Sequence, residues 1–444
     1  MFDEDYKKTL AQELKISDLS LLDSIVGENE FRFLLSKLDE QSFSPGMRTD
    51  KSKIDTFDLS NLKNHKFCAN LHVHTNASDG LADIEGILEA ALKIADENAS
   101  NGGFGFVLGI TDHDTVKNAQ RALQIVSANK DKYKNLKLVL GVEISTVATE
   151  FSHQIKTLDI HTLLYCINPF EKRLCDYLKN KMELKFELAN KTLNALKEAL
   201  APLLKDLKLL LTLEEAAKIH PMITKGQDEV SHPLKKYIFA GTLYAYYADN
   251  NPQIQAILQK EGVNKELLSY EKPVFKYKSM FNNERYFYIY KEALEKYLNF
   301  ITGGKYGITL PQIPENIEQY LLKAKEICEC SHPQKGRKIE AFSEFSQTLK
   351  FINTLDYGLA SIAHPARINT NYIDSPLDVF FDEFWHMYKK YGEDRAYAYE
   401  KYYQSYSGKK HFERIEAINP TAEKYNFAHT GGIDSHGYGV CSRA

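Results

Sequence analysis

The sequence lacks the marks of secreted proteins, membrane-spanning proteins and proteins that bind long nucleic acids. Among its 444 residues, no apolar stretch approaches the roughly 20 residues that cross a bilayer. The charged start, Met-Phe-Asp-Glu-Asp-Tyr-Lys-Lys, has no apolar signal core, and the six cysteines follow no disulfide spacing. The net charge is -4 and no long run of Lys or Arg occurs, which argues against long nucleic acid but not against a nucleotide-sized ligand. We therefore expect a cytoplasmic protein with no membrane partner.

Apolar runs of strand length alternate with helical stretches in two parts of the chain. One helix is expected over Ala82–Asn98, between the first two runs, and such alternation is typical of a parallel sheet or a barrel. Seven runs are expected to be strands: Phe67–His74, Phe104–Thr111, Leu136–Ile144, Thr157–Tyr165, Gly358–Ala363, Arg414–Ile418 and Tyr425–Gly431.

The composition divides the chain into four parts. Residues 1–66 are helical and charged, then irregular, and are expected to be an extension that packs on another part. Residues 67–170 and 350–444 contain the strand-like runs. Residues 171–349 are rich in Leu, Lys, Glu and Ala with apolar residues at helical spacing, which predicts a mainly helical insertion.

The first run ends in a pair of histidines. His72 and His74 stand two residues apart, so on a strand both imidazoles point to the same face. Asp79 follows shortly after the strand end. Imidazole and carboxylate groups gathered in this way are good ligands for a transition metal.

Six of the seven runs bring a His, Asp or Glu to the strand or its C-terminal end. In a closed α/β barrel these ends converge on one mouth, where functional sites are built. The pattern therefore predicts one site at that mouth. The residues are His72, His74, Asp112, His113, Asp114, Glu143, Asp159, His161, His364, Asp434 and His436.

This ordered set resembles the polymerase and histidinol phosphatase (PHP) superfamily of metal-dependent phosphoesterases, over residues 67–170 and 350–440. The matching motifs are His-x-His, Asp-Gly, Thr-Asp-His-Asp, Gly-x-Glu, His, His-Pro and Asp-x-His. The Ala-Ser-Asp-Gly and Ile-Thr-Asp-His-Asp-Thr segments are similar to the branch that hydrolyses nucleotide 3′-phosphates and short RNAs. The resemblance implies a distorted seven-stranded (β/α) TIM-like barrel, with residues 171–349 as an enlarged helical cap over the substrate.

The resemblance also implies the ligands of two or three divalent ions, which the donor types allow to be Mn, Fe or Zn. One ion would be held by His72, His74, Glu143 and Asp434, a second by Asp79, His113 and His436, and a third by His161, His364 and the bridging Glu143. The attacking group would be a metal-bound water. No protein nucleophile is expected, and neither a Gly-x-Ser-x-Gly nor a Cys-x5-Arg loop is evident.

Several weaker candidates accompany these ligands. Of four His-Pro pairs, only the one at His364 follows a strand-like run, whereas His232 lies in the insertion and is a candidate substrate contact. Arg367 is a candidate phosphate contact through its fork of donors, or else a surface arginine. Asp112 is expected to orient a ligand from behind. The Tyr-rich stretch 397–406 is either packing or a base-stacking surface.

The expected function is hydrolysis of a phosphate ester, with a 3′-phosphorylated nucleotide or short oligonucleotide as substrate. A phosphomonoesterase for a small metabolite such as histidinol phosphate is the alternative among enzymes. A non-catalytic PHP module with a binding or structural role is the alternative of another class. The sequence leaves open the oligomeric state, the metal and the role of residues 1–66.

Overall fold

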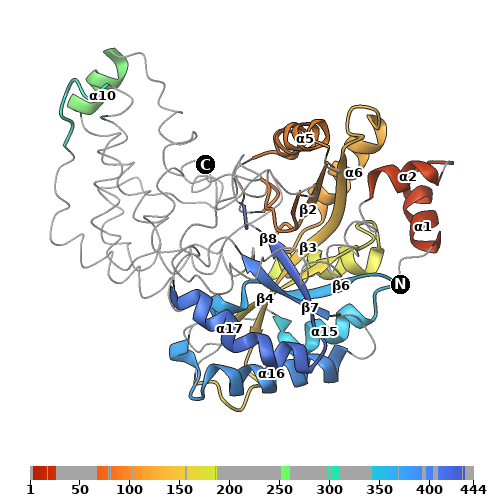
Figure 1. Ribbon diagram of the computed structural model, residues 1–444. Helices are drawn as coiled ribbons and strands as arrows, with labels where there is room; N and C mark the ends of the chain where they lie inside the picture. Colours follow the sequence, from red (N-terminus) through yellow and green to blue (C-terminus); the bar gives the residue numbers. More distant parts are fainter. Residues whose placement is uncertain are drawn as a thin grey trace. The chain divides into compact units, whose positions relative to one another are not determined.

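The computed structural model describes a set of ranges that includes most of the barrel and little of the insertion: 4–17, 19–26, 68–78, 80, 82–102, 105–155, 158–185, 187, 252–260, 299, 303–309, 343–368, 370–392, 397–403, 409–432 and 434–435. The chain forms two compact units (Figure 1). The first comprises Met1–Met182 with Glu340–Ala444, and the second is Glu183–Ile339. In the second unit, the described residues include α10 (Pro252–Lys260) and a turn at residues 303–306.

The first unit is built on a nearly closed sheet whose path, within the described residues, has seven strands. In order around the barrel they are β1 (Cys68–Asn70), β2 (Phe106–Ile110), β3 (Leu136–Ala148), β4 (Leu158–Tyr165), β6 (Leu359–Ile362), β7 (Tyr397–Tyr403) and β8 (Ala428–Gly432). A two-residue strand, β5 (Ser343–Glu344), pairs with β3 off this path. The predicted seven-stranded TIM-like barrel is confirmed.

Two features distort the barrel. β4 runs antiparallel to both β3 and β6, whereas the other pairs along the path are parallel. The ring is closed where the segment after β1 meets the end of β8 and the segment after it: Leu71 N donates to Gly431 O (3.3 Å), Ser435 N to His72 O (3.2 Å) and His74 N to Ser435 O (2.8 Å). The closing seam therefore runs through the predicted ligand segments.

One predicted strand is wrong. Arg414–Ile418 lies within helix α17 (Lys409–Lys424), and the strand at this place in the barrel is the Tyr-rich β7. Ile415, Ile418 and Ala422 are buried at a spacing that suits one face of a helix. Tyr397 and Tyr399 are buried in β7, which supports packing rather than base stacking for those two aromatic residues.

Helices cover the barrel in two groups (Figure 1). α5 (Ile84–Ser100) and α6 (Lys117–Ala128) form one, and α15 (Phe345–Asn353), α16 (Leu377–Gly392) and α17 the other. The helix expected over Ala82–Asn98 is confirmed as α5, which begins after Asp83, whose side chain accepts a hydrogen bond from Gly86 N (2.7 Å). Short 3-10 turns, η4 (Pro365–Arg367) and η5 (Thr370–Tyr372), follow β6. Across the described ranges, no helix combines the length and apolar character of a membrane span.

The described start of the chain packs on the barrel. α1 (Glu4–Leu14) places Tyr6 in the core, where its hydroxyl donates to Ile167 O (2.8 Å). α2 (Ser20–Ile25) contacts α6 and β3, and Val26 bridges to Leu138. After β4 in the sequence, residues 172–182 are helical and belong to the barrel unit, with Leu174 and Leu178 buried.

Candidate metal centre

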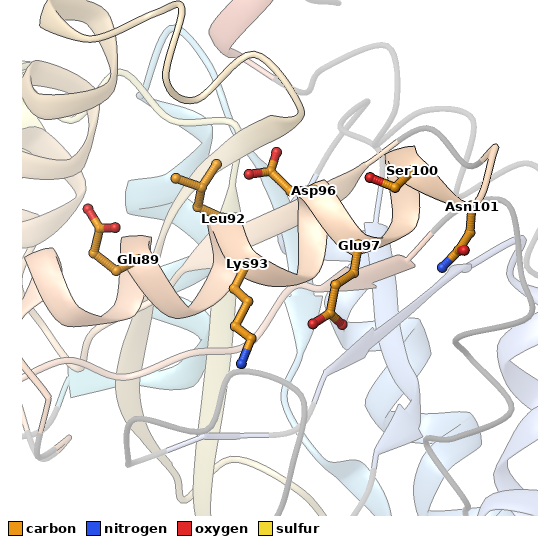
Figure 2. Close-up of a pocket in the computed structure, with 7 residues that line it drawn as sticks. All are labelled: Glu89, Leu92, Lys93, Asp96, Glu97, Ser100 and Asn101. Carbon is orange, nitrogen blue, oxygen red and sulfur yellow. The ribbon is translucent and has the colours of Figure 1, made fainter.

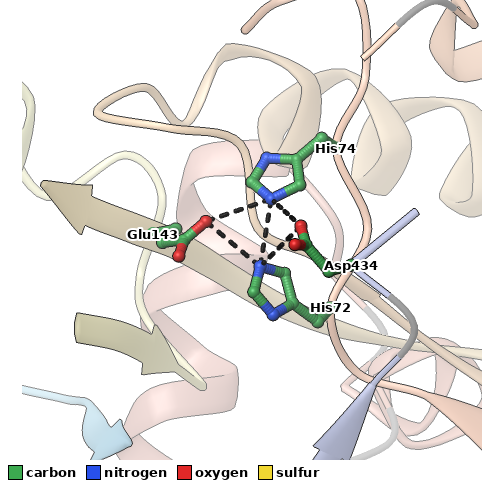
Figure 3. A group of neighbouring side chains, drawn as sticks. All are labelled: His72, His74, Glu143 and Asp434. Carbon is green, nitrogen blue, oxygen red and sulfur yellow. Dashed lines mark hydrogen bonds and ion pairs between the residues drawn. The ribbon is translucent and has the colours of Figure 1, made fainter. Parts of the chain in front are cut away.

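Four predicted ligands meet in the barrel interior (Figure 3). His74 Nε2 lies 3.0 Å from His72 Nε2, 3.0 Å from Glu143 Oε2 and 3.1 Å from Asp434 Oδ1. His72 Nε2 lies 3.1 Å from the same Glu143 oxygen and 3.5 Å from Asp434 Oδ1. His72 and His74 come from the segment after β1, Glu143 from β3 and Asp434 from the segment after β8, so the barrel closure assembles this group.

The second oxygen of Glu143 faces two further histidines. Glu143 Oε1 lies 3.0 Å from His161 Nδ1 and 3.4 Å from His364 Nε2. His113 approaches the first oxygen instead, with Nδ1 3.3 Å from Oε2. One buried carboxylate thus stands between two sets of imidazoles. We call His72, His74 and Asp434 the closed side of Glu143, and His161 and His364 the open side.

The backbone at the ends of β6 and β8 is shaped to present two of these side chains. His364 has φ 35° and ψ 53°, and Asp434 has φ 53°, both in the left-handed region that non-glycine residues seldom occupy. Such conformations cost on the order of 1–3 kcal/mol each and persist where the surroundings enforce them, often at functional sites. Both residues are predicted ligands, so the strained positions coincide with the predicted centre.

The donor geometry fits a cation. Atoms that each lie about 2.1 Å from one ion are about 3.0 Å apart at right angles and about 3.4 Å apart at tetrahedral angles. The contacts among the closed-side atoms and Glu143 Oε2 span 3.0–3.5 Å. Mixed imidazole and carboxylate donors suit Mn, Fe or Zn. These residues therefore fit a divalent metal ion.

Without metal, the cluster holds protons. Burial disfavours the charged form of His72, but Glu400, Glu143 and Asp434 outweigh burial and raise its pKa well above the ordinary value. At His161, burial is likewise outweighed, by Asp159 and Glu143, and its pKa rises to about 10. Burial alone would raise the pKa of Glu143, yet His113, His72 and His161 hold it well below its usual range. Metal binding must displace these protons.

Asp112 supports the loop that follows His74. Its carboxylate accepts from Thr75 N (2.6 Å), Thr75 Oγ1 (2.7 Å) and Ser78 Oγ (2.6 Å), and Ser78 Oγ lies 3.5 Å from His74 Nδ1. Burial raises the pKa of Asp112 despite these hydrogen bonds. The side chain therefore lies behind His74, where the sequence places an orienting residue.

Two further carboxylates contact the histidines, and only one of them, Asp159, is among the residues predicted at the barrel mouth. Glu400, in β7, lies 3.0 Å from His72 Nδ1, and Asp159, in β4, has Oδ1 3.2 Å from His161 Nε2. Glu400 gives no strand-end signal because it sits within a run of tyrosines. Asp159 precedes His161 by two residues on the same strand face, and the sequence places it at the barrel mouth without a role as a ligand.

Of the four remaining predicted site residues, the structure describes one, Arg367. Arg367 lies at the rim of the cluster, with Nη1 3.4 Å from Asp434 Oδ2, and its side chain is 44% exposed. Asp79, His436 and His232 lie outside the described residues. The two predicted partners of His113 are thus not described, and the structure groups His113 with Glu143 and His161.

A surface depression elsewhere has no part in this cluster. It is lined by residues of α5 and by the residue after it: Glu89, Leu92, Lys93, Asp96, Glu97, Ser100 and Asn101 (Figure 2). None of these residues is a predicted ligand.

Comparisons with known proteins add little to this geometry. No protein-family model and no curated protein matches the sequence. Solved structures similar to it include a proposed metal-dependent phosphoesterase from Bifidobacterium adolescentis and an amidohydrolase from Chromobacterium violaceum with bound sulfate and no metal, each at 15% identity and a TM-score of 0.42. The matches cover 84% of this chain and 88% and 87% of the two structures. Similarity at this level does not establish a shared function, and the function proposed below is based on the residues of the site.

Proposed function

We propose that this chain is a metal-dependent phosphoesterase. The observation that carries the proposal is the position of Glu143, whose Oε2 faces His72, His74 and His113 while Oε1 faces His161 and His364. A carboxylate with imidazoles on both oxygens is suited to bridge two cations, an arrangement common in phosphatases. Divalent cations held there would activate water and offset negative charge on the phosphoryl oxygens.

We take water to be the nucleophile. Among the described residues, Ser78 is a hydroxyl beside His74, and its Oγ donates to Asp112 Oδ1 (2.6 Å). The same carboxylate accepts from Thr75 N and Thr75 Oγ1, so this hydrogen bond belongs to the network that supports the loop after His74. Metal ions held by the cluster would activate water directly, and hydrolysis in one displacement step follows from that proposal.

Arg367 is the side chain that we propose to hold the phosphate. It lies in η4 directly after His364, is half-exposed, and contacts Asp434 at the rim of the cluster. Arg414 fixes this loop from α17, because its Nη1 donates to Ala366 O (3.0 Å) and its Nη2 to Thr370 Oγ1 (2.8 Å). A guanidinium on a fixed loop beside the metal ligands can bind two phosphoryl oxygens at once.

The substrate we propose is a 3′-phosphorylated nucleotide or a short oligonucleotide. The support is the resemblance of the Ala-Ser-Asp-Gly and Thr-Asp-His-Asp segments to the nucleotide branch of the PHP superfamily. A small monoester such as histidinol phosphate is the competing substrate. The residue predicted to contact the substrate from the insertion, His232, lies outside the described residues.

The test is hydrolysis of three compounds with Mn²⁺: a nucleoside 3′,5′-bisphosphate, a phosphate bis-ester and a simple monoester. We expect phosphate release from the bisphosphate. In Glu143→Gln, kcat/KM should fall at least about 10³-fold, which corresponds to about 4 kcal/mol.

Glu344→Gln is the matched control, because Glu344 is a buried carboxylate that accepts from Thr149 Oγ1 (2.8 Å) rather than from a predicted ligand. Its activity should equal that of the wild type. Preference for the simple monoester would favour the small-metabolite alternative. Metal-loaded protein that cleaves none of the three compounds would overturn the proposed activity and favour a non-catalytic role.

A further inference from the structure

Glu400 is a fully buried carboxylate whose two oxygens have separate partners. It lies in β7 with 0% of its side chain exposed. Oε1 is 3.0 Å from His72 Nδ1, and Oε2 accepts the backbone N–H of His364 at 2.8 Å. Burial of an acidic group is costly unless hydrogen bonds compensate it, so both contacts are needed where Glu400 stands.

The contact with His72 determines which ring nitrogen is available. A neutral imidazole has one N–H donor and one acceptor nitrogen, and a carboxylate requires the donor. With Nδ1–H directed at Glu400, the lone pair resides on Nε2, which faces His74, Glu143 and Asp434. Carboxylate contacts of this kind fix the tautomer and the ring orientation of metal-binding histidines.

The contact with His364 supports a strained backbone. His364 is in the left-handed region and precedes Pro365, which restricts its conformation further. The hydrogen bond to Glu400 Oε2 offsets part of that cost. The ring of His364 stacks on that of His72 with centroids 6.0 Å apart and planes 16° apart. Glu400 therefore contacts two histidines that also contact each other.

The local backbone is adapted to this arrangement. The β7–β8 pairing shifts register between Glu400 and Tyr402, and such bulges redirect a side chain next to a functional site. Opposite, a Cβ on Gly432 would lie 2.3 Å from His72 Cβ and 3.1 Å from Glu400 Oε1. A larger residue at Gly432 would therefore separate the pair.

We propose that Glu400 is a positioning residue of the metal centre. It directs His72 Nε2 toward the other donors of the closed side and fixes the His364 backbone on the open side. It touches neither metal nor substrate in this role. The inference rests on the proposed function only in requiring that the centre binds metal.

Glu400→Gln is the informative variant because it keeps the shape and reverses one hydrogen bond. The backbone N–H of His364 can only donate, so it takes the amide oxygen and leaves the amide NH₂ facing His72 Nδ1. Nδ1 must then accept, which places the proton on Nε2 where metal should bind. We expect affinity for Zn²⁺ and Mn²⁺, measured by chelator competition, to fall about 10- to 100-fold.

A spectroscopic measurement separates this role from simple destabilisation. In the zinc-loaded wild-type protein, NMR of ¹⁵N-labelled histidine should show a protected Nδ1–H at His72, assigned by its loss in His72→Gln. In Glu400→Gln this resonance should vanish, while Glu344→Gln should keep both the resonance and the wild-type metal affinity. If Glu400→Gln fails to fold, the Nδ1–H resonance of the wild type still tests the proposal.

Two outcomes are distinguishable. Equal metal affinities of wild type, Glu400→Gln and Glu344→Gln, or a zinc-loaded His72 without Nδ1–H, would overturn the role of Glu400 and leave the proposed function intact. A wild-type protein that binds metal but cleaves no phosphate ester would overturn the proposed function and leave the role of Glu400 intact.

Discussion

The two sides of Glu143 differ in their access to solvent. On the closed side, the side chains of His72 and His74 are 0% exposed, that of Asp434 is 12% exposed, and Glu400 behind His72 is 0% exposed. On the open side, His161 and His364 are 20% and 18% exposed, and Asp159 behind His161 is 22% exposed. The arrangement of imidazole backed by carboxylate is therefore repeated at two depths. We propose that the buried histidines of the closed side hold an ion more tightly than the partly exposed histidines of the open side.

The largest expected effect comes from substituting one histidine on each side. His74→Gln should lower metal affinity by about 10³-fold or more, because it removes a fully buried donor from the four groups that surround one point. His161→Gln should lose metal only from the open side. Metal content after dialysis, measured by mass spectrometry, should fall further in the first variant than in the second. Equal losses would contradict a difference between the sides.

A smaller effect is expected from pH on the metal-free protein. The pKa of His161 is raised from 6.5 to about 10, so the charged imidazole stabilises the fold fully below pH 6.5, and this contribution is lost as pH rises toward 10. The raised pKa of His72 acts in the same direction. Tm of the metal-free protein should therefore fall between pH 6.5 and 10, by roughly 1–2 °C for each kcal/mol of stability lost.

The metal-loaded protein should not follow that decline. Protons compete with metal for the same nitrogens, so affinity rises with pH across the range in which the metal-free cluster loses protons. Calorimetric scans with and without Zn²⁺ at several pH values would test this. A parallel decline in both states would mean that the imidazoles do not take up metal.

The smallest effect is expected at the outer carboxylate of the open side. Asp159→Asn should weaken metal affinity about two- to fivefold, less than Glu400→Gln, because water can replace a partly exposed carboxylate. The effect should also shrink in high salt, whereas that of Glu400→Gln should not. Chelator competition at two salt concentrations measures both. A loss at Asp159 as large as that at Glu400 would show that burial does not distinguish the two carboxylates.

The residues at or near strand ends could be predicted from local sequence patterns. His72, His74, Glu143, His161, His364 and Asp434 lie in strands or directly after them, and convergence of strand ends in a barrel was sufficient to bring them together. Their roles as metal ligands remain predictions. Glu400 could not be found in this way, since its partner His72 lies 328 residues away along the chain and neither neighbour of Glu400 signals a polar site.

The misplaced strand has a similar cause. Arg414–Ile418 is a short run whose apolar residues suit either a strand or one turn of a buried helix, and only the neighbouring turn with Ala422 decides for a helix. The actual strand, β7, was not predicted because its tyrosines are compatible with a packed strand and with an exposed base-stacking surface alike. Identifying β7 as a strand would have placed Glu400 in the barrel.

The seam that closes the barrel has a consequence for assembly of the protein. The hydrogen bonds between Ser435 and the residues around His72 join segments from opposite ends of the barrel sequence, and contacts of such long sequence separation form late in folding because loop closure is entropically costly. The same segments bring His72, His74 and Asp434 together. An ion bound there would link the first and last strands of the barrel. We therefore expect the stability of the closed barrel to depend on the metal available to the newly made chain.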